Sequence, residues 1–180
     1  MRAVLDACVI YPTVLREILL GCAEAGLYQP LVSERILGEW VRATVKLGPE
    51  APMIAEGEAA LLRARFPRAV IAAQPQIEAR LHLPDENDRH VLAVAIAGHA
   101  DCIVTFNAQD FPRHLLAEEG LDRRDPDGLL WEFHSHAPAV VEGVVGRVLA
   151  RASALAGQEI SLKSLLKRAR LNRLSRAMGL

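Results

Sequence analysis

The sequence contains no hydrophobic run long enough to cross a membrane. Apolar residues make up 51% of the 180 residues, yet no stretch approaches the ~20 consecutive apolar residues that a membrane-spanning helix needs. Asp6 interrupts the first apolar segment, residues 3–11, so this segment also lacks the uninterrupted apolar region and small-residue cleavage site of a signal peptide. We therefore expect a cytoplasmic protein.

Cysteine and histidine are too few and too scattered for the common metal motifs. The three cysteines, Cys8, Cys22 and Cys102, are odd in number and are not paired at metal-type spacing, so we expect reduced thiols in the core. The six histidines form no HxxxH or HExxH arrangement, which argues against zinc.

Acidic residues are missing from the last twenty positions, although the net charge of the chain is only −1. The same stretch, residues 161–180, carries six basic residues: Lys163, Lys167, Arg168, Arg170, Arg173 and Arg176. A basic arm beside an acidic site would suit metal-dependent work on a polyanion. The solvated face of a terminal helix explains the same charges equally well.

The first two thirds of the chain alternate between strand-like and helix-like segments. Short apolar runs at residues 3–5, 70–71 and 103–104 predict buried strands. Apolar residues at helical spacing predict helices at residues 14–22, 36–41, 49–66 and 91–97. We also expect Ser33 to cap a helix and Trp40 to lie in the core. This alternation predicts βα units around a small parallel sheet.

The remaining third has weaker signals. Residues 121–128 are predicted to form a polar connection, after a possible short helix at residues 113–119. Helices are predicted at residues 129–134 and 139–155, and Gly157 is expected to break the chain before the basic tail. There is no internal repeat and no low-complexity segment, which is consistent with one domain or one domain with an appendage.

Acidic side chains and one amide stand at the ends of these predicted elements. Asp6 ends the first strand, Glu39 lies on a helix, Asp88 begins a helix, and Asn107 with Asp110 follows the last strand. Ligands bind outside the carboxyl ends of strands in α/β sheets. No lysine or arginine stands beside Asp6 in the sequence, so a divalent cation such as Mg²⁺ or Mn²⁺ is the natural compensation for its charge.

Each of these residues also has an ordinary structural explanation. Asp6 is explained as well by a turn, and Asp85 is better explained as a helix cap than as a metal ligand. We expect Thr105 to hydrogen-bond a carboxylate rather than act as a nucleophile. His90 is expected to be a solvated or capping histidine.

Taken in order, these segments resemble a known family. The stretches VLDACVIYP, SERILGEW, PDENDRHVLAVAIAGHADCIVTFN and AQDFP look like those of the PIN-domain nucleases, in particular the VapC-like toxins of type II toxin–antitoxin systems. The family's acidic and polar marks fall on Asp6, Glu39, Asp88, Thr105, Asn107 and Asp110. The resemblance covers about residues 2–112.

The resemblance implies a fold and an activity. The fold would be a three-layer α/β/α sandwich with a central parallel sheet, formed by a PIN-like domain at residues 1–136, with a helical, basic C-terminal extension at residues 137–180. The activity would be Mg²⁺- or Mn²⁺-dependent endoribonuclease hydrolysis of RNA. The implied catalytic and metal-binding residues are Asp6, Glu39, Asp88 and Asp110, with Thr105 and Asn107 orienting substrate or water. The implied partners are a cognate small antitoxin protein and a second copy of the chain in a homodimer.

Other functions stay open at this point. Many relatives carry Asp where this chain has Asn107, and an uncharged amide weakens a second metal site. This departure favours, as an alternative, a catalytically weak PIN-like module that binds RNA or protein. An aspartate phosphatase of the haloacid dehalogenase type would need a second acid where this chain has Cys8. A purely structural α/β domain would leave the ordered acids unexplained.

Overall fold

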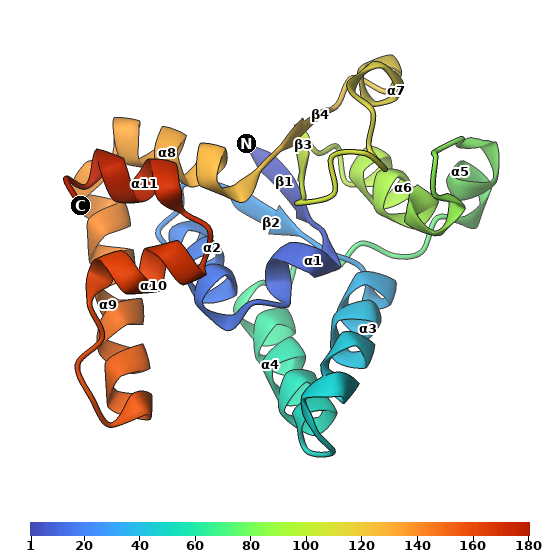
Figure 1. The fold of residues 1–180 in the computed structure, drawn as a ribbon. Coiled ribbons are helices and arrows are strands. Elements are labelled where there is room, and N and C mark those ends of the chain that lie inside the picture. Colours follow the sequence, from blue (N-terminus) through green and yellow to red (C-terminus); the bar gives the residue numbers. More distant parts are fainter. The chain divides into compact units, whose positions relative to one another are not determined.

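The computed structural model describes all residues, 1–180 (Figure 1). Its chain divides into two compact units. The first unit comprises Met1–Tyr11 and Tyr28–Arg123, and the second comprises Pro12–Leu27 and Arg124–Leu180. No helix in the structure is both long and apolar enough to span a membrane. The predicted boundary between residues 136 and 137 stays a prediction.

A four-stranded sheet organises the fold, in the order β2-β1-β3-β4. Its strands are β1 (Arg2–Leu5), β2 (Gln29–Leu31), β3 (Cys102–Val104) and β4 (Asp122–Arg124). β1 runs parallel to both of its neighbours, with Val4 opposite Leu31 on one side and Ile103 on the other. Since β1 and β3 are parallel, the residues that follow them, Asp6 and Thr105, leave the sheet at the same edge.

Helices and 3₁₀ turns complete the first unit. They are α1 (Ala7–Ile10), α3 (Glu34–Ala43), η1 (Thr44–Leu47), α4 (Ala51–Arg65), α5 (Pro75–Arg80), η2 (Glu86–Asp88), α6 (Arg89–Ala97) and α7 (Arg113–Glu118). Ser33 caps α3, because its Oγ accepts a hydrogen bond from Ile36 N at 3.2 Å, and Trp40 is buried. α6 packs against β1 and β3 through its small apolar side chains. The predicted α/β/α fold with a central parallel sheet is confirmed.

The second unit is entirely helical apart from the end of β4. It contains α2 (Thr13–Glu24), α8 (Pro126–His136), α9 (Pro138–Ala156), α10 (Leu162–Arg168) and α11 (Asn172–Ala177). α2 packs closely on α9, and a Cβ at Gly21 would lie only 2.6 Å from Val144 Cγ1. α8 contacts both α9 and α11. Gly157 ends α9 in the left-handed conformation, with φ of 64°, as its predicted breaking role requires.

Two predictions, for residues 121–128 and 70–71, are corrected by the structure. Residues 121–128 are not simply a polar connection, because they contain β4 and the first turn of α8, which Asp125 caps through Gly128 N at 2.8 Å. β4 is an edge strand of three charged residues, so its sequence has no apolar alternation to reveal it. Residues 70–71 form no full strand, since only Val70 makes an isolated bridge, with Val32.

The three cysteines are free, and Cys22 and Cys102 are buried as predicted. Cys8 is half-buried and lies beside Asp6, to which its thiol donates a hydrogen bond at 3.1 Å. Burial is the main cause that raises the pKa of the Cys8 thiol to about 12, and the charge of Asp6 adds to the effect. The thiol therefore stays protonated and acts as a donor.

Candidate metal centre

Asp6 occupies the point where β1 turns into α1. Its side chain is only 8% exposed, and a buried carboxylate requires partners or a cation. Oδ2 accepts hydrogen bonds from Thr105 Oγ1 at 2.7 Å and from the Cys8 thiol at 3.1 Å. The backbone amide of Asp6 also donates to Val104 O at 3.1 Å. Asp6 is thus fixed to the end of β3 by both its side chain and its backbone.

The segment after β3 continues this hydrogen-bonded chain. Thr105 Oγ1 accepts from the backbone amide of Asn107 at 2.9 Å while it donates to Asp6. The side-chain amide of Asn107 in turn donates to Oδ2 of Asp110. The prediction that Thr105 hydrogen-bonds a carboxylate is confirmed, and Asn107 is placed to hold a second one.

Three carboxylates converge beside these residues. Single oxygens of Asp85, Asp88 and Asp110 all lie within 4.8 Å of one another, in an arrangement that could hold a metal ion. Asp85 Oδ1 also accepts hydrogen bonds from the backbone and side-chain nitrogens of Asn87, at 2.9 and 3.0 Å. Asp85 is therefore a cap of η2, as predicted, and at the same time a member of the carboxylate group.

The electrostatics of Asp88 show how much negative charge gathers here. Its pKa is raised from 3.8 to about 6, chiefly by burial and then by the charges of Asp6, Asp110 and Asp85, with His90 acting in the opposite direction. The raised pKa means that Asp88 ionises against the cost of burial and, in addition, against the repulsion of its neighbours. A divalent cation among these oxygens would remove that repulsion.

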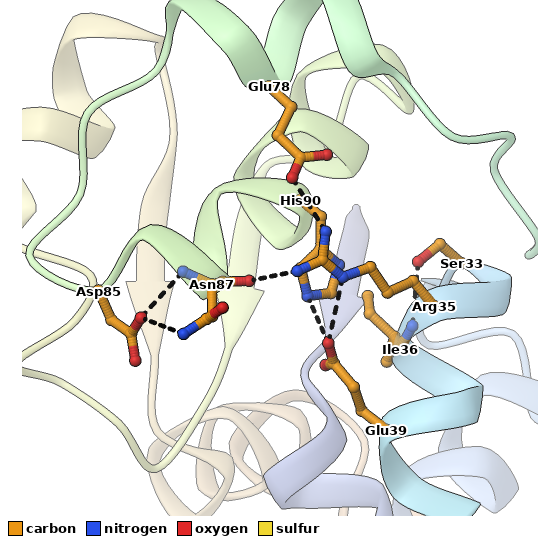
Figure 2. Close-up of polar contacts among 8 residues, drawn as sticks. All are labelled: Ser33, Arg35, Ile36, Glu39, Glu78, Asp85, Asn87 and His90. Atoms are coloured by element: carbon orange, nitrogen blue, oxygen red, sulfur yellow. Dashed lines mark hydrogen bonds and ion pairs between the residues drawn. The ribbon is translucent and has the colours of Figure 1, made fainter.

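Glu39 lies in a separate polar network, which Figure 2 shows. Its Oε1 is 3.0 Å from Nε2 of His90 and 3.3 Å from Nε of Arg35. Arg35 reaches on to Glu78 at 3.0 Å and to the backbone oxygen of Asn87 at 3.2 Å. Burial works to raise the pKa of Glu39, but contact with His90 and Arg35 outweighs it and holds that pKa below the ordinary value.

The structure therefore brings together most of the predicted site, with one exception and one addition. Asp88 and Asp110 belong to the carboxylate group, and Asp6 lies near enough to raise the pKa of Asp88. Glu39 is not one of the three grouped acids and contacts Arg35 and His90 instead. Asp85 is the addition. The sequence feature that could have indicated this role of Asp85 was its position three residues before Asp88. Helix capping explained the same position, so the sequence did not distinguish the two roles.

The expectation that His90 is solvated or caps a helix is wrong. The side chain is neither solvated nor capping, because it is only 4% exposed and contacts Glu39, while its Nδ1 has no hydrogen-bond partner. The residues one helical turn later on α6, Ala93 and Val94, are both buried. That apolar i+3 and i+4 spacing was the available signal for a buried histidine.

The residues present fit a hard divalent cation. All donors in the group are carboxylate oxygens, which Mg²⁺ and Mn²⁺ prefer, and no soft thiolate takes part, since the Cys8 thiol is protonated. Asp85, Asp88 and Asp110 would be the ligands, with Asp6 adjoining.

Comparison with known families agrees with this geometry. The PIN domain family profile matches residues 2–109, a range that includes Asp6, Glu39, Asp85 and Asp88 but not Asp110, which lies just beyond it. The chain belongs to the PIN-domain family. PIN domains are generally nucleases and usually use divalent metals. No curated protein and no solved structure matches the chain.

Proposed function

We propose that this protein is a Mg²⁺- or Mn²⁺-dependent endoribonuclease that hydrolyses phosphodiester bonds. The observation that carries the proposal is the group formed by Asp85, Asp88 and Asp110, whose oxygens lie within 4.8 Å of one another in a chain of the PIN family. The raised pKa of Asp88 supports it, because surplus negative charge favours a bound cation.

The roles of the side chains follow from their contacts. A bound divalent ion would acidify the attacking water and neutralise the charge that develops on the phosphate. Thr105 holds Oδ2 of Asp6 and leaves Oδ1 available, while Asn107 orients the carboxylate of Asp110. Glu39 stays a predicted ligand, and it would have to exchange its contacts with Arg35 and His90 to become one.

Cleavage of a mixed RNA pool in Mg²⁺, Mn²⁺ or EDTA tests the proposal. We expect the wild-type chain to cleave RNA only with the metal, and Asp88→Asn to lose at least about a hundredfold in rate. Glu159→Gln is the matched control, because Glu159 is exposed and makes no ion pair. Cleavage that persists in EDTA and in Asp88→Asn would identify a contaminating nuclease and would contradict the proposal.

The same experiment separates the enzyme from a catalytically weak PIN-like module. Such a module would bind the RNA pool without cutting it in either metal. The hydrogen bond from Asn107 to Asp110, in place of a further acid, is the feature that favours this second function. Metal-dependent cleavage that Asp88→Asn abolishes would exclude it.

The proposed cellular role is that of a toxin held inactive by a small antitoxin. An acidic site attracts a basic side chain, so an antitoxin segment with a lysine or arginine would neutralise the same carboxylates that hold the metal. Expression of the chain alone should arrest growth, and co-expression of a neighbouring small reading frame should relieve it. Growth unaffected by the active enzyme would argue for a housekeeping nuclease.

Light scattering of the purified chain tests the predicted homodimer.

A further inference from the structure

An open cavity of about 460 Å³ lies at the surface of the second unit, between α8 and α11. Its lining residues are Trp131, Arg173, Arg176 and Ala177. The two helices pack on each other, and Figure 1 shows α11 lying along α8. The cavity is formed by residues that the metal centre does not use, and its volume is in the range of small-ligand sites.

Trp131 is an unusual residue to find exposed at this position. Its neighbours on α8, Leu129, Leu130 and Phe133, are buried, whereas Trp131 is 46% exposed and lines the cavity. The chain's other tryptophan, Trp40, is buried in the first unit. A tryptophan ring left open to solvent presents a flat apolar face on which a nucleic acid base stacks.

Two arginines that form no ion pair stand beside this ring. Arg173 and Arg176 are exposed and three residues apart on α11, and neither guanidinium forms an ion pair. The guanidinium of Arg173 reaches the start of α8, where a Cβ at Gly128 would lie 3.3 Å from its Nη1 and 2.7 Å from Oδ2 of Asp125. The cavity therefore combines one aromatic face with two positive charges.

The nearby acids are engaged in holding the backbone. The carboxylate of Asp127 accepts from the backbone amides of Arg173 and Leu174, at 2.8 and 3.0 Å. Asp125 accepts from Gly128 N at 2.8 Å. These contacts fix the start of α11 against the start of α8, so the two arginines are presented by a rigid support.

We infer that this cavity, formed by Trp131, Arg173 and Arg176, is a second nucleic-acid site that holds one nucleotide of single-stranded RNA, with its base on the indole and its phosphate on the guanidiniums. The inference rests on the proposed ribonuclease function for the identity of the nucleic acid. Arginine suits this task because its planar fork pairs with phosphate oxygens in two places. An acidic peptide would use the same charges but would have no need of the indole face.

The basic tail could attract RNA through its total charge or through specific residues, and these two explanations predict different effects of single substitutions. Diffuse attraction by the tail would depend on its total charge, so Lys163 would matter as much as Arg173. A built nucleotide site depends on the residues that line the cavity. Lys163 is exposed on α10 and does not line it, which makes Lys163→Gln a matched control for removal of one charge.

The inference is tested by measuring the affinity of the full chain for a labelled short oligouridylate, by fluorescence anisotropy. EDTA is present because no cleavage is expected without metal. We expect Trp131→Ala to weaken binding about tenfold and Trp131→Phe to retain most of it, since a smaller ring still stacks. Arg173→Gln and Arg176→Gln should each weaken binding several-fold and make the dependence of log K on log salt less steep. Lys163→Gln should change affinity less than about twofold.

Three results would overturn the inference. The first is wild-type affinity in Trp131→Ala, and the second is an equal loss in Lys163→Gln and Arg173→Gln, which would indicate diffuse charge. The third is an acidic peptide that binds through Trp131, Arg173 and Arg176 when oligouridylate does not. Thermal melts of the variants check folding. Metal-dependent cleavage is measured in a separate experiment. If the Trp131 variants bind RNA normally, the ribonuclease proposal still stands; if no cleavage is found, RNA binding at Trp131 in EDTA can still be detected.

Discussion

Thr105 donates a hydrogen bond from its hydroxyl to Oδ2 of Asp6 across 2.7 Å. Both residues are buried, and each directly follows a strand of the same parallel pair, β3 and β1. The bond therefore links two segments ninety-nine positions apart at the sheet edge where the carboxylates gather. It satisfies one oxygen of a carboxylate that would otherwise be buried without enough partners.

Replacing the hydroxyl of Thr105 should weaken both the fold and the site. Thr105→Val keeps the shape but leaves Asp6 Oδ2 and the amide of Asn107 each short of one hydrogen bond. We expect the free energy of unfolding in EDTA to fall by about 1–3 kcal/mol, as measured by urea denaturation. RNA cleavage should also decrease, because Asp6 is no longer held.

Thr105→Ser is the matched control, since it retains the hydroxyl and removes only a methyl group. It should recover most of the stability and of the cleavage rate. If Thr105→Val and Thr105→Ser lose the same stability, then packing rather than the hydrogen bond to Asp6 is what Thr105 contributes.

The raised pKa of Asp88 makes the stability of the metal-free chain depend on pH. Its pKa is about 6 in the folded chain against an ordinary value of 3.8, so between these values the folded state binds a proton that the unfolded state does not. The free energy of unfolding should therefore rise as the pH falls from about 7 toward about 4. Ionised Asp88 destabilises the fold above pH 6.

Asp88→Asn should remove this penalty. We expect the variant in EDTA to be more stable than wild type by about 1 kcal/mol at pH 7, a value reduced for the partial exposure of Asp88, and the difference should vanish at about pH 4. Glu159→Gln should show no such change. Parallel pH profiles for wild type and Asp88→Asn would show that Asp88 carries no repulsion. Added Mn²⁺ should stabilise wild type and not Asp88→Asn.

The positions of several candidate-site residues could be predicted because they follow from chain direction. A parallel sheet places the ends of β1 and β3 at one edge, so Asp6 and Thr105 could be brought together from the strand pattern alone. Asp88 could be placed by the apolar helix that follows it. The double role of Asp85 could not, because capping and clustering give the same sequence signal.

Other features escaped prediction for physical reasons. β4 is an edge strand of charged residues, and its pairing with the sheet depends on tertiary context rather than on an apolar pattern. The contact between His90 and Glu39 joins α6 to α3, and no local spacing encodes it. The tail was predicted to be a helical, basic extension, but its buried residues were not predicted; they are Leu165, Leu166, Leu171 and Leu174, in α10, α11 and the turn between them.

Removing the charge of Glu39 should destabilise the chain through His90. The imidazole is buried and its Nδ1 already lacks a partner, so Glu39→Gln weakens the one contact that compensates Nε2. We expect a loss of about 1–3 kcal/mol in the free energy of unfolding. Arg35→Gln is the comparison, and it should cost less than about 1 kcal/mol because Arg35 is 44% exposed.

Mn²⁺ titration by calorimetry tests the other role predicted for Glu39. If Glu39 also ligates the metal, Glu39→Gln should weaken Mn²⁺ binding by about tenfold or more, as a lost carboxylate ligand would. Unchanged affinity, together with the loss of stability, would limit Glu39 to its contact with His90. Asp110→Asn should weaken binding in either case, since Asp110 belongs to the carboxylate group.

Asn107→Asp should make the candidate metal centre more acidic. The substitution replaces the amide that donates to Asp110 with a carboxylate that repels it. In EDTA the free energy of unfolding should fall by about 1–2 kcal/mol. Mn²⁺ should bind about tenfold more tightly, with a second ion at high concentration, because the site gains a charged oxygen ligand.

Gln158→Glu is the control, because it adds the same charge at an exposed position of the second unit. It should leave Mn²⁺ affinity unchanged. Equal effects in both variants would show that net charge, rather than a ligand at residue 107, controls metal binding.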